Sequence, residues 1–192
     1  GWYPSRDAMD NFLRIVIPAV SSVKGHVYWQ ARAVSPNVHV RYQTPRGSRH
    51  GALICVLVDP FEVSGVPYTE PVVIVEGPMD ALAVAECGYD AIALMGIKPG
   101  NEALEHLVTL VKKRPTLIVL DNEPLAQSAA CSVALHLAST GVHAHIDRFR
   151  FAKDFAAMPM LTRKAWLISR LDVKGDNQRT LKDILQNPIE EL

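Results

Sequence analysis

A run of four β-branched residues, Val72 to Val75, leads directly into an acid, a glycine and a proline. An unbroken apolar run of this kind predicts a strand buried on both faces, which is typical of a parallel sheet. Gly77 permits a sharp turn, and Pro78 suits the first turn of a helix, where no backbone N–H is needed. The sequence therefore predicts strand, turn and helix, with Glu76 at the carboxyl end of the strand. In open α/β sheets, ligands and metal ions bind at this end.

Strands and helices alternate from this point to residue 149. We expect strands at 72–76, 91–95, 116–120 and 143–149, and helices near 78–87, 101–113 and 124–139. The second helix has apolar residues at helical spacing and is expected to begin at an Asn101 cap. Such alternation predicts an α/β fold, a Rossmann-like parallel sheet with helices on both faces.

The first 58 residues have a β pattern instead. Strands are expected at 13–18, 26–33, 38–42 and 52–58, in one small antiparallel or mixed sheet, after a turn-like leading segment that contains Pro4–Asp7. A connector with prolines and a glycine follows at 59–71. We therefore predict three parts: a small mixed β-rich N-terminal subdomain at 1–71, the α/β domain at 72–160 and a C-terminal helical segment at 161–192.

Composition excludes several classes of protein. No apolar run reaches the roughly 18 residues of a spanning helix, and no basic-then-apolar leader opens the chain, so we expect a cytoplasmic protein without a membrane partner. The three cysteines are widely spaced, which predicts neither a disulfide framework nor a C-x-x-C zinc site. With 20 acids and 20 bases, bulk charge does not favour nucleic-acid binding. Residues 24–50, however, hold five Lys and Arg residues and no acid.

A second acidic strand end follows the first. The apolar run 116–120 leads into Asp121, with Glu123 two residues later, and Asp80 lies one turn into the first helix. Carboxylates at neighbouring strand ends repel one another unless cations neutralise them. Mg²⁺ prefers such oxygen ligands and usually binds one or two carboxylates together with substrate phosphates. The pattern therefore indicates phosphoryl transfer, in which metal ions hold the attacking and leaving oxygens.

Short motifs at this spacing resemble the Toprim domain, in particular that of bacterial and phage DNA primases. The motifs are Glu76-Gly77-x-x-Asp80, Asp121-x-Glu123, Lys153-Asp154 and the glycine-led strand 88–96. Upstream, Ile17-Pro18, the segment from Gly25 to Arg32, and Arg41-Tyr42 with Pro45 are similar to the N-terminal subdomain of the primase catalytic core. The resemblance extends over about residues 14–160.

The resemblance implies a primase catalytic core, a nucleotidyltransferase that makes short RNA primers by two-metal phosphoryl transfer. The implied catalytic residues are Glu76, Asp121 and Glu123, and these three with Asp80 and Asp154 would hold two Mg²⁺ or Mn²⁺ ions. The residues expected to contact nucleotide or nucleic acid are Arg32, Arg41, Tyr42, Lys153 and Lys98. The implied partners are a single-stranded DNA template, ribonucleoside triphosphates and a replicative helicase. We expect a monomer in the cytoplasm of a bacterial or phage-infected cell.

The chain departs from the family pattern at three places. Glu123 replaces an aspartate, Leu125-Ala126-Gln127 stands where the family has Ala-Gly, and Ala156 occupies the place of a further acid. Alternative interpretations therefore stay open. Asp80 could serve only as a first-turn acid that the helix dipole stabilises, Lys153-Asp154 could be a surface pair, and Arg32 and Arg41 could be plain strand residues. The aromatic residues Tyr28, Trp29 and Tyr42 are expected in the core rather than stacked on bases.

Two other functions fit the same pattern. A Toprim nuclease would use similar carboxylates to cut a nucleic acid, and metal-dependent nicking without nucleotides would identify it. A non-catalytic module would bind single-stranded nucleic acid or a replication partner, and tight binding without Mg²⁺ would identify it.

Overall fold

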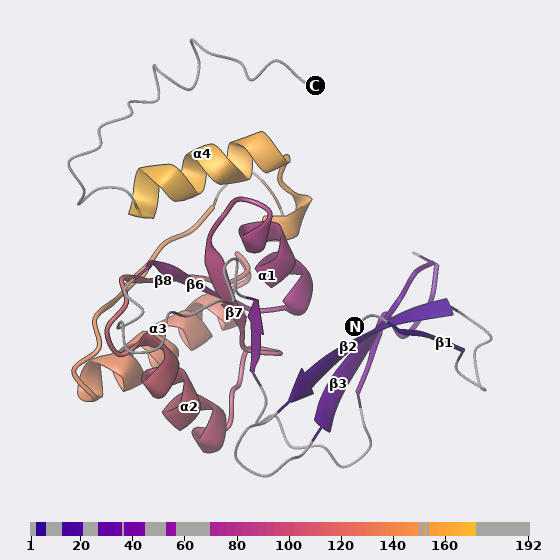
Figure 1. Cartoon of the computed structure of the whole chain (residues 1–192), viewed down its shortest axis with the longest axis horizontal. Coiled ribbons are helices and arrows are strands. Elements are labelled where there is room, and N and C mark those ends of the chain that lie inside the picture. The colour runs from indigo at the N-terminus through magenta and orange to yellow at the C-terminus, as the bar shows by residue number, and fades with distance from the viewer. Residues whose placement is uncertain are drawn as a thin grey trace.

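The computed structural model describes residues 3–6, 13–20, 27–35, 37–44, 53–56, 70–149, 152 and 154–171. These residues form two sheets with helices around the second (Figure 1). The first sheet has four antiparallel strands in the order β1-β2-β3-β4, and the second has five strands in the order β5-β7-β6-β8-β9. The predicted fold class, a parallel α/β sheet with helices on both faces after a β-rich N-terminal part, is confirmed.

The first sheet consists of β1 Tyr3–Arg6, β2 Leu13–Val20, β3 Val27–Ala33 and β4 Tyr42–Gln43. The long β2 pairs with the whole of β3, from Arg14 opposite Ala33 to Val20 opposite Val27. Two predictions need correction. The segment at residues 3–6 is an edge strand rather than a turn, a position in which Pro4 is tolerated. Of the strand expected at 38–42, only its last residue is in a strand.

The second sheet contains four parallel strands, β6 Val72–Val75, β7 Asp90–Ala93, β8 Thr116–Val119 and β9 Ala144–Ile146. Its fifth strand, β5 Ile54–Val56, runs antiparallel to β7 at the edge. The prediction that this strand belongs to the first sheet is wrong. Leu53 and Ile54 are buried on opposite faces of the second sheet, and an apolar run alone does not indicate which sheet it joins. The domain boundary at residue 71 stays a prediction.

The helices are α1 Pro78–Ala85, α2 Asn101–Val111, α3 Pro124–Ser139, a short 3-10 helix η1 Phe155–Ala157, and α4 Met160–Leu171. The predicted Asn101 cap is wrong, because Gly100 is the N-cap of α2 and no side chain caps that end. Of the C-terminal helical segment predicted at 161–192, the part after residue 171 lies outside the described residues. Within the ranges given above, no helix is long and apolar enough to cross a bilayer.

Alternate residues of the central strands face opposite layers. Val73 and Val75 of β6 pack with α1, η1 and α4, whereas Val72 and Ile74 pack with α2 and α3. All four side chains are fully buried, as expected for a strand that is covered on both faces. Figure 1 shows α1 and α4 on one side of this sheet and α2 and α3 on the other.

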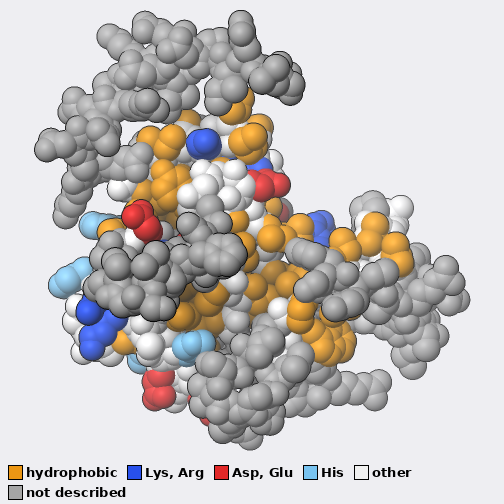
Figure 2. Space-filling view, viewed as in Figure 1, with side chains coloured by type: hydrophobic (Ala, Val, Ile, Leu, Met, Phe, Trp, Pro, Cys, Tyr) orange, Lys and Arg blue, Asp and Glu red, His pale blue; other side chains and the backbone are white. Residues whose placement is uncertain are grey.

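On the face that Figure 2 shows, the described residues present few charged side chains. Hydrophobic side chains occupy much of its centre, and the Lys and Arg side chains of the described residues do not join into one patch there. This distribution agrees with the zero net charge of the chain.

A buried ion pair fixes the amino ends of the parallel strands, opposite the acidic edge. Arg114, just before β8, places Nη2 2.6 Å from Oδ2 of Asp90, and both side chains are almost completely buried. The same guanidinium donates to the carbonyls of Glu70 and Pro71. Arg114 thus connects β8, β7 and the segment that leads into β6.

We predict that Asp90→Ala lowers the free energy of unfolding by about 3 kcal/mol, because it leaves a buried guanidinium without its carboxylate. Glu86→Ala is the control, since it removes the partner of another arginine, Arg163, but the Glu86 side chain is 63% exposed. The control should cost less than about 1 kcal/mol. Urea unfolding of both variants checks this, and equal losses would contradict it.

Candidate active site

Glu76 and Asp121 follow two neighbouring parallel strands. Val75, the last residue of β6, lies opposite Val119, the last residue of β8. Glu76 comes next after β6, and Asp121 comes two residues after β8, so both lie at the carboxyl edge of the sheet. Both residues are partly buried. The edge therefore brings together two of the three acids expected to be catalytic.

The loop after β7 holds the backbone at Glu76. The N–H of Leu94 donates to the carbonyl of Val75, and the N–H of Gly96 donates to the carbonyl of Glu76 at 3.3 Å. Between them, Met95 is buried with φ at 61°, a conformation that costs energy in a residue other than glycine. Strain of this kind persists where the surrounding structure imposes it, and it occurs here beside the acidic edge.

The pKa of Glu76 is raised from its ordinary value to about 7. Partial burial is the largest cause, followed by the negative charges of Asp121, Asp80 and Glu123. The charges of three other carboxylates therefore act on Glu76 at this edge. Near neutral pH a substantial fraction of Glu76 would be protonated, and any nearby cation would favour its charged form.

Asp80 lies in the first turn of α1 and reaches a segment far along the chain. Its Oδ1 accepts a hydrogen bond from the N–H of Ala156 at 3.0 Å. Its pKa is raised, first by burial and then by the charge of Asp154, while the Ala156 N–H opposes the shift. A Cβ on residue 77 would lie 3.3 Å from Asp80 Oδ2, so the glycine leaves room for this carboxylate. Asp80 thus has a tertiary role besides its place at the helix dipole.

Asp154 is the N-cap of η1. Its Oδ1 accepts from the N–H of Ala157 at 2.8 Å. The buried ring of Phe155 fixes the segment through edge-on contacts with Phe149, at 5.8 Å, and Trp166, at 5.9 Å. Lys153, which was expected to contact nucleotide, lies outside the described residues.

Glu123 is exposed and is the N-cap residue of α3, although its side chain makes no capping hydrogen bond. It belongs to the acidic edge through its effect on the Glu76 pKa. In the described ranges, no three His, Cys, Asp or Glu side chains converge closely enough to hold a metal ion. The neighbouring acids therefore act on Glu76 through their charges, but the described residues do not form a closed set of metal ligands.

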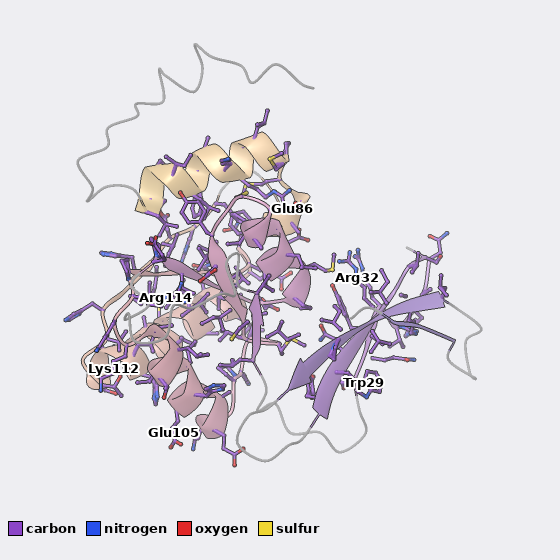
Figure 3. The ribbon with its side chains drawn as sticks, viewed as in Figure 1. Trp29, Arg32, Glu86, Glu105, Lys112 and Arg114 are labelled. Carbon is purple, nitrogen blue, oxygen red and sulfur yellow. The ribbon has the colours of Figure 1, made fainter. Side chains whose placement is uncertain are left out.

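Arg32 and Tyr42 face each other across β3 and β4 of the first sheet. They are directly paired in register, and Cζ of Arg32 lies 5.7 Å from the centre of the Tyr42 ring. This is a cation–π contact. Figure 3 shows Arg32 on the side of the first sheet that faces α1.

Charges of both signs affect the pKa of Tyr42. Burial raises its pKa, Arg32 and Arg41 lower it, and Asp80 and Asp154 raise it. The ring thus lies within electrostatic range of the basic strands and of the acidic segments. It is 37% exposed, so the expectation that it belongs to the core is wrong.

The other expected residues are placed differently. Tyr28 is buried, in agreement with the core prediction, and Trp29 is partly buried. Arg41 is exposed, and its carbonyl accepts from the N–H of Ala33. Lys98 is exposed between β7 and α2, and among the described residues no contact joins it to the acids.

Asn122 and Gln127 were missed by sequence reasoning. Asn122 Nδ2 donates to the carbonyls of Phe149, at 2.5 Å, and Ala152, at 3.3 Å. Gln127 is buried, and its Nε2 donates a hydrogen bond to the carbonyl of Asp121. Gln127 is the one strongly polar residue in the otherwise small or apolar start of α3, and this contrast is the signal that could have identified it.

We predict that ion-free protein loses stability as pH rises from about 5 to 8. The folded Glu76 has a raised pKa, so the folded chain binds more protons than the unfolded chain in this window, and the free energy of unfolding falls with pH. The expected loss from this residue is about 1 to 2 kcal/mol after allowance for solvent screening.

Glu76→Gln should remove this part of the pH dependence and leave a smaller slope from Asp80. Urea unfolding with a chelator at both pH values measures it, and Glu105→Gln on the exposed side of α2 is the matched control. A slope in Glu76→Gln equal to that of the wild type would show that the carboxylates do not repel as described.

Residues 73–158 match the family described as Toprim-like. Comparison with curated proteins gave no match. Among solved structures, the primase fragment of the bacteriophage T7 primase-helicase protein is 15% identical with a TM-score of 0.61, over 90% of this chain and 67% of that chain. The RNA polymerase domain of Mycobacterium tuberculosis primase DnaG is 18% identical with a TM-score of 0.59, over 88% and 59%.

A third similar structure is a DnaG primase catalytic domain bound to single-stranded DNA. It is 17% identical with a TM-score of 0.60, over 83% of this chain and 51% of that chain. The chain thus spans about half to two thirds of the length of these three structures. Matches over 83–90% of this chain take in more than the Toprim-like residues, so the likeness of fold extends to the first sheet.

Proposed function

We propose that this chain, in which residues 73–158 form a Toprim-like domain, is the catalytic core of a DNA primase. It would act as a nucleotidyltransferase that joins ribonucleoside triphosphates into short RNA primers on a single-stranded DNA template in the cytoplasm, with a replicative helicase as partner. The observation that carries the proposal is the placement of Glu76 and Asp121 after the ends of two neighbouring parallel strands. The charge of Asp80 acts on Glu76 and also on Tyr42 of the first sheet. The fold of both sheets supports the proposal, because it resembles primase fragments.

The donor set suits Mg²⁺ or Mn²⁺. The acids at this edge offer carboxylate oxygens, burial and the charges of the neighbouring acids raise the pKa of Glu76, and a divalent cation would favour its charged form. In the proposal, Glu76 and Asp121 hold two ions together with the nucleotide phosphates, and Glu123, Asp80 and Asp154 complete the acidic field. Mg²⁺ often binds only one or two carboxylates together with substrate oxygens, so the proposal needs no cluster of three acidic ligands. Such ions, when bound, stabilise charge on the attacking and leaving oxygens.

In the proposed reaction, the primer 3′-oxygen attacks the α-phosphorus of the incoming triphosphate. A phosphorus–oxygen bond forms there, the bond to the β-phosphate oxygen breaks, and pyrophosphate leaves while the 3′-hydroxyl loses its proton. Residues in and next to β3 and β4 would serve phosphate and base recognition. Arg32 and Arg41 supply positive charge for the phosphates, and the exposed ring of Tyr42 offers a stacking surface.

We predict that Glu76→Gln and Asp121→Asn each reduce template-directed dinucleotide synthesis by at least about 100-fold, because each removes a metal-binding charge. Synthesis is measured with Mn²⁺ and labelled triphosphates on single-stranded DNA, and circular dichroism checks the fold. Glu105→Gln, which removes an exposed acid from α2, should synthesise like the wild type.

Three outcomes would contradict the primase proposal. One is unchanged synthesis in both variants. A second is metal-dependent nicking of DNA without nucleotides, which would identify a nuclease. The third is tight DNA binding that does not depend on divalent ions, with no triphosphate binding, which would identify a binding module.

We also predict that Arg32→Gln weakens binding of a labelled ribonucleoside triphosphate about tenfold, because it removes a charged hydrogen-bond donor. Lys112→Gln is the matched control. It removes the same charge at the C-cap of α2, and Figure 3 shows Lys112 far from Arg32. Calorimetry in Mn²⁺ gives both affinities, and an equal effect of the two substitutions would indicate bulk charge rather than a site at β3 and β4.

A further inference from the structure

The four residues from Leu120 to Glu123 connect β8 to α3 and carry two acids of the candidate site. A carboxylate at such a connection is only as well placed as the backbone that holds it. We propose that Gln127 is a positioning residue, which fixes this connection so that Asp121 faces the carboxyl edge of the sheet. The inference rests on the proposed function, because it concerns the ion-binding role of Asp121.

Gln127 binds three of the four carbonyls in the connection. Its backbone N–H donates to the carbonyl of Glu123 at 3.0 Å. Its side-chain Nε2 donates to the carbonyl of Asp121 at 2.8 Å and to that of Leu120 at 3.3 Å. Side chains on a helix lean toward its N-terminus, so a residue one turn into α3 reaches back to the end of β8.

The orientation of the Gln127 amide is determined by its partners. The carbonyls of Leu120 and Asp121 can only accept, so the NH₂ group must face them. On the other side, Nε of Arg148 donates to Oε1 of Gln127, and a guanidinium can only donate. An amide satisfies both sides at once, whereas a carboxylate or an apolar side chain does not.

Because Gln127 is buried, the loss of its hydrogen bonds to the connection would cost stability. Gln127 is only 5% exposed, and a buried carbonyl that loses its donor is costly. The remaining residue of the connection, Asn122, is held separately by the hydrogen bonds that its side chain donates to the carbonyls of Phe149 and Ala152. The side chains of Gln127 and Asn122 therefore tie the connection to α3 and to the chain after β9.

The test compares Gln127→Met with Thr116→Val. Met keeps the length of the side chain but neither donates nor accepts. Thr116 is the first residue of β8, at the end of the strand away from the acids. It is buried and donates from Oγ1 to the carbonyl of Arg114 at 3.0 Å. Thr116→Val thus removes a comparable hydrogen bond away from the acidic edge.

Two measurements are made on each variant of the whole chain. Amide hydrogen exchange without metal should be at least about tenfold faster at residues 121–123 in Gln127→Met than in Thr116→Val. Mn²⁺ affinity, measured by calorimetry with Mn²⁺ alone, should fall about tenfold in Gln127→Met, the usual effect of removing a group that orients a metal ligand, and should not fall in Thr116→Val.

Arg148→Met provides a second variant that tests the same contact from an exposed position, and it should give a smaller change in the same direction. Exchange and Mn²⁺ affinity in Gln127→Met equal to those in Thr116→Val would overturn the inference. If Gln127→Met does not fold, wild-type exchange and affinity in Arg148→Met would overturn it. Absence of Mn²⁺ binding in the wild type would contradict the proposed function and the role of Gln127 in it, whereas the exchange rates report on the connection separately.

Discussion

Repulsion among carboxylates at one edge of a parallel sheet is the constraint on which the account of this chain depends. The sheet aligns the ends of β6 and β8, and the turns that follow place Glu76 and Asp121 at the same edge. The cost appears in the pKa of Glu76, which burial and three neighbouring acids raise to about 7. An arrangement that disfavours its own charge is suited to bind cations, since their charge reverses the effect.

The rest of the structure holds this edge in place. Apolar strands buried on both faces keep the parallel register, and the Arg114–Asp90 pair joins the strands at the opposite end. At the acidic edge itself, Met95 adopts a strained backbone beside the Glu76 carbonyl, and Gln127 and Asn122 hold the connection that carries Asp121. Apolar burial and the Arg114–Asp90 ion pair thus hold one end of the parallel strands, and backbone and side-chain hydrogen bonds hold the loops at the other end.

The fold class could be predicted because it depends on local patterns. The β-branched run of β6 and the alternation that follows it leave few alternatives to a parallel sheet with helices on both faces. The location of Glu76 and Asp121 at strand ends follows from the same pattern. The sheet to which β5 belongs could not be predicted, because Leu53 and Ile54 look the same in either sheet.

Contacts between residues far apart in the chain could not be predicted from the sequence either. Arg148 reaches Gln127 over 21 positions, and Asn122 reaches Phe149 over 27. The residues of each pair are too far apart in the sequence to form a recognisable motif. In the second contact, moreover, the acceptor is a backbone carbonyl, which any residue provides. Tyr42 was expected in the core since strand aromatics usually are, yet its ring is exposed beside Arg32.

The most direct test of the central claim is the anomalous difference map of a crystal soaked in Mn²⁺. The account predicts anomalous density at the carboxyl edge of the sheet, within coordination distance of the carboxylates of Glu76 and Asp121. Well-diffracting crystals with Mn²⁺ bound only elsewhere, or with no ion at this edge at a concentration that saturates binding in solution, would contradict it.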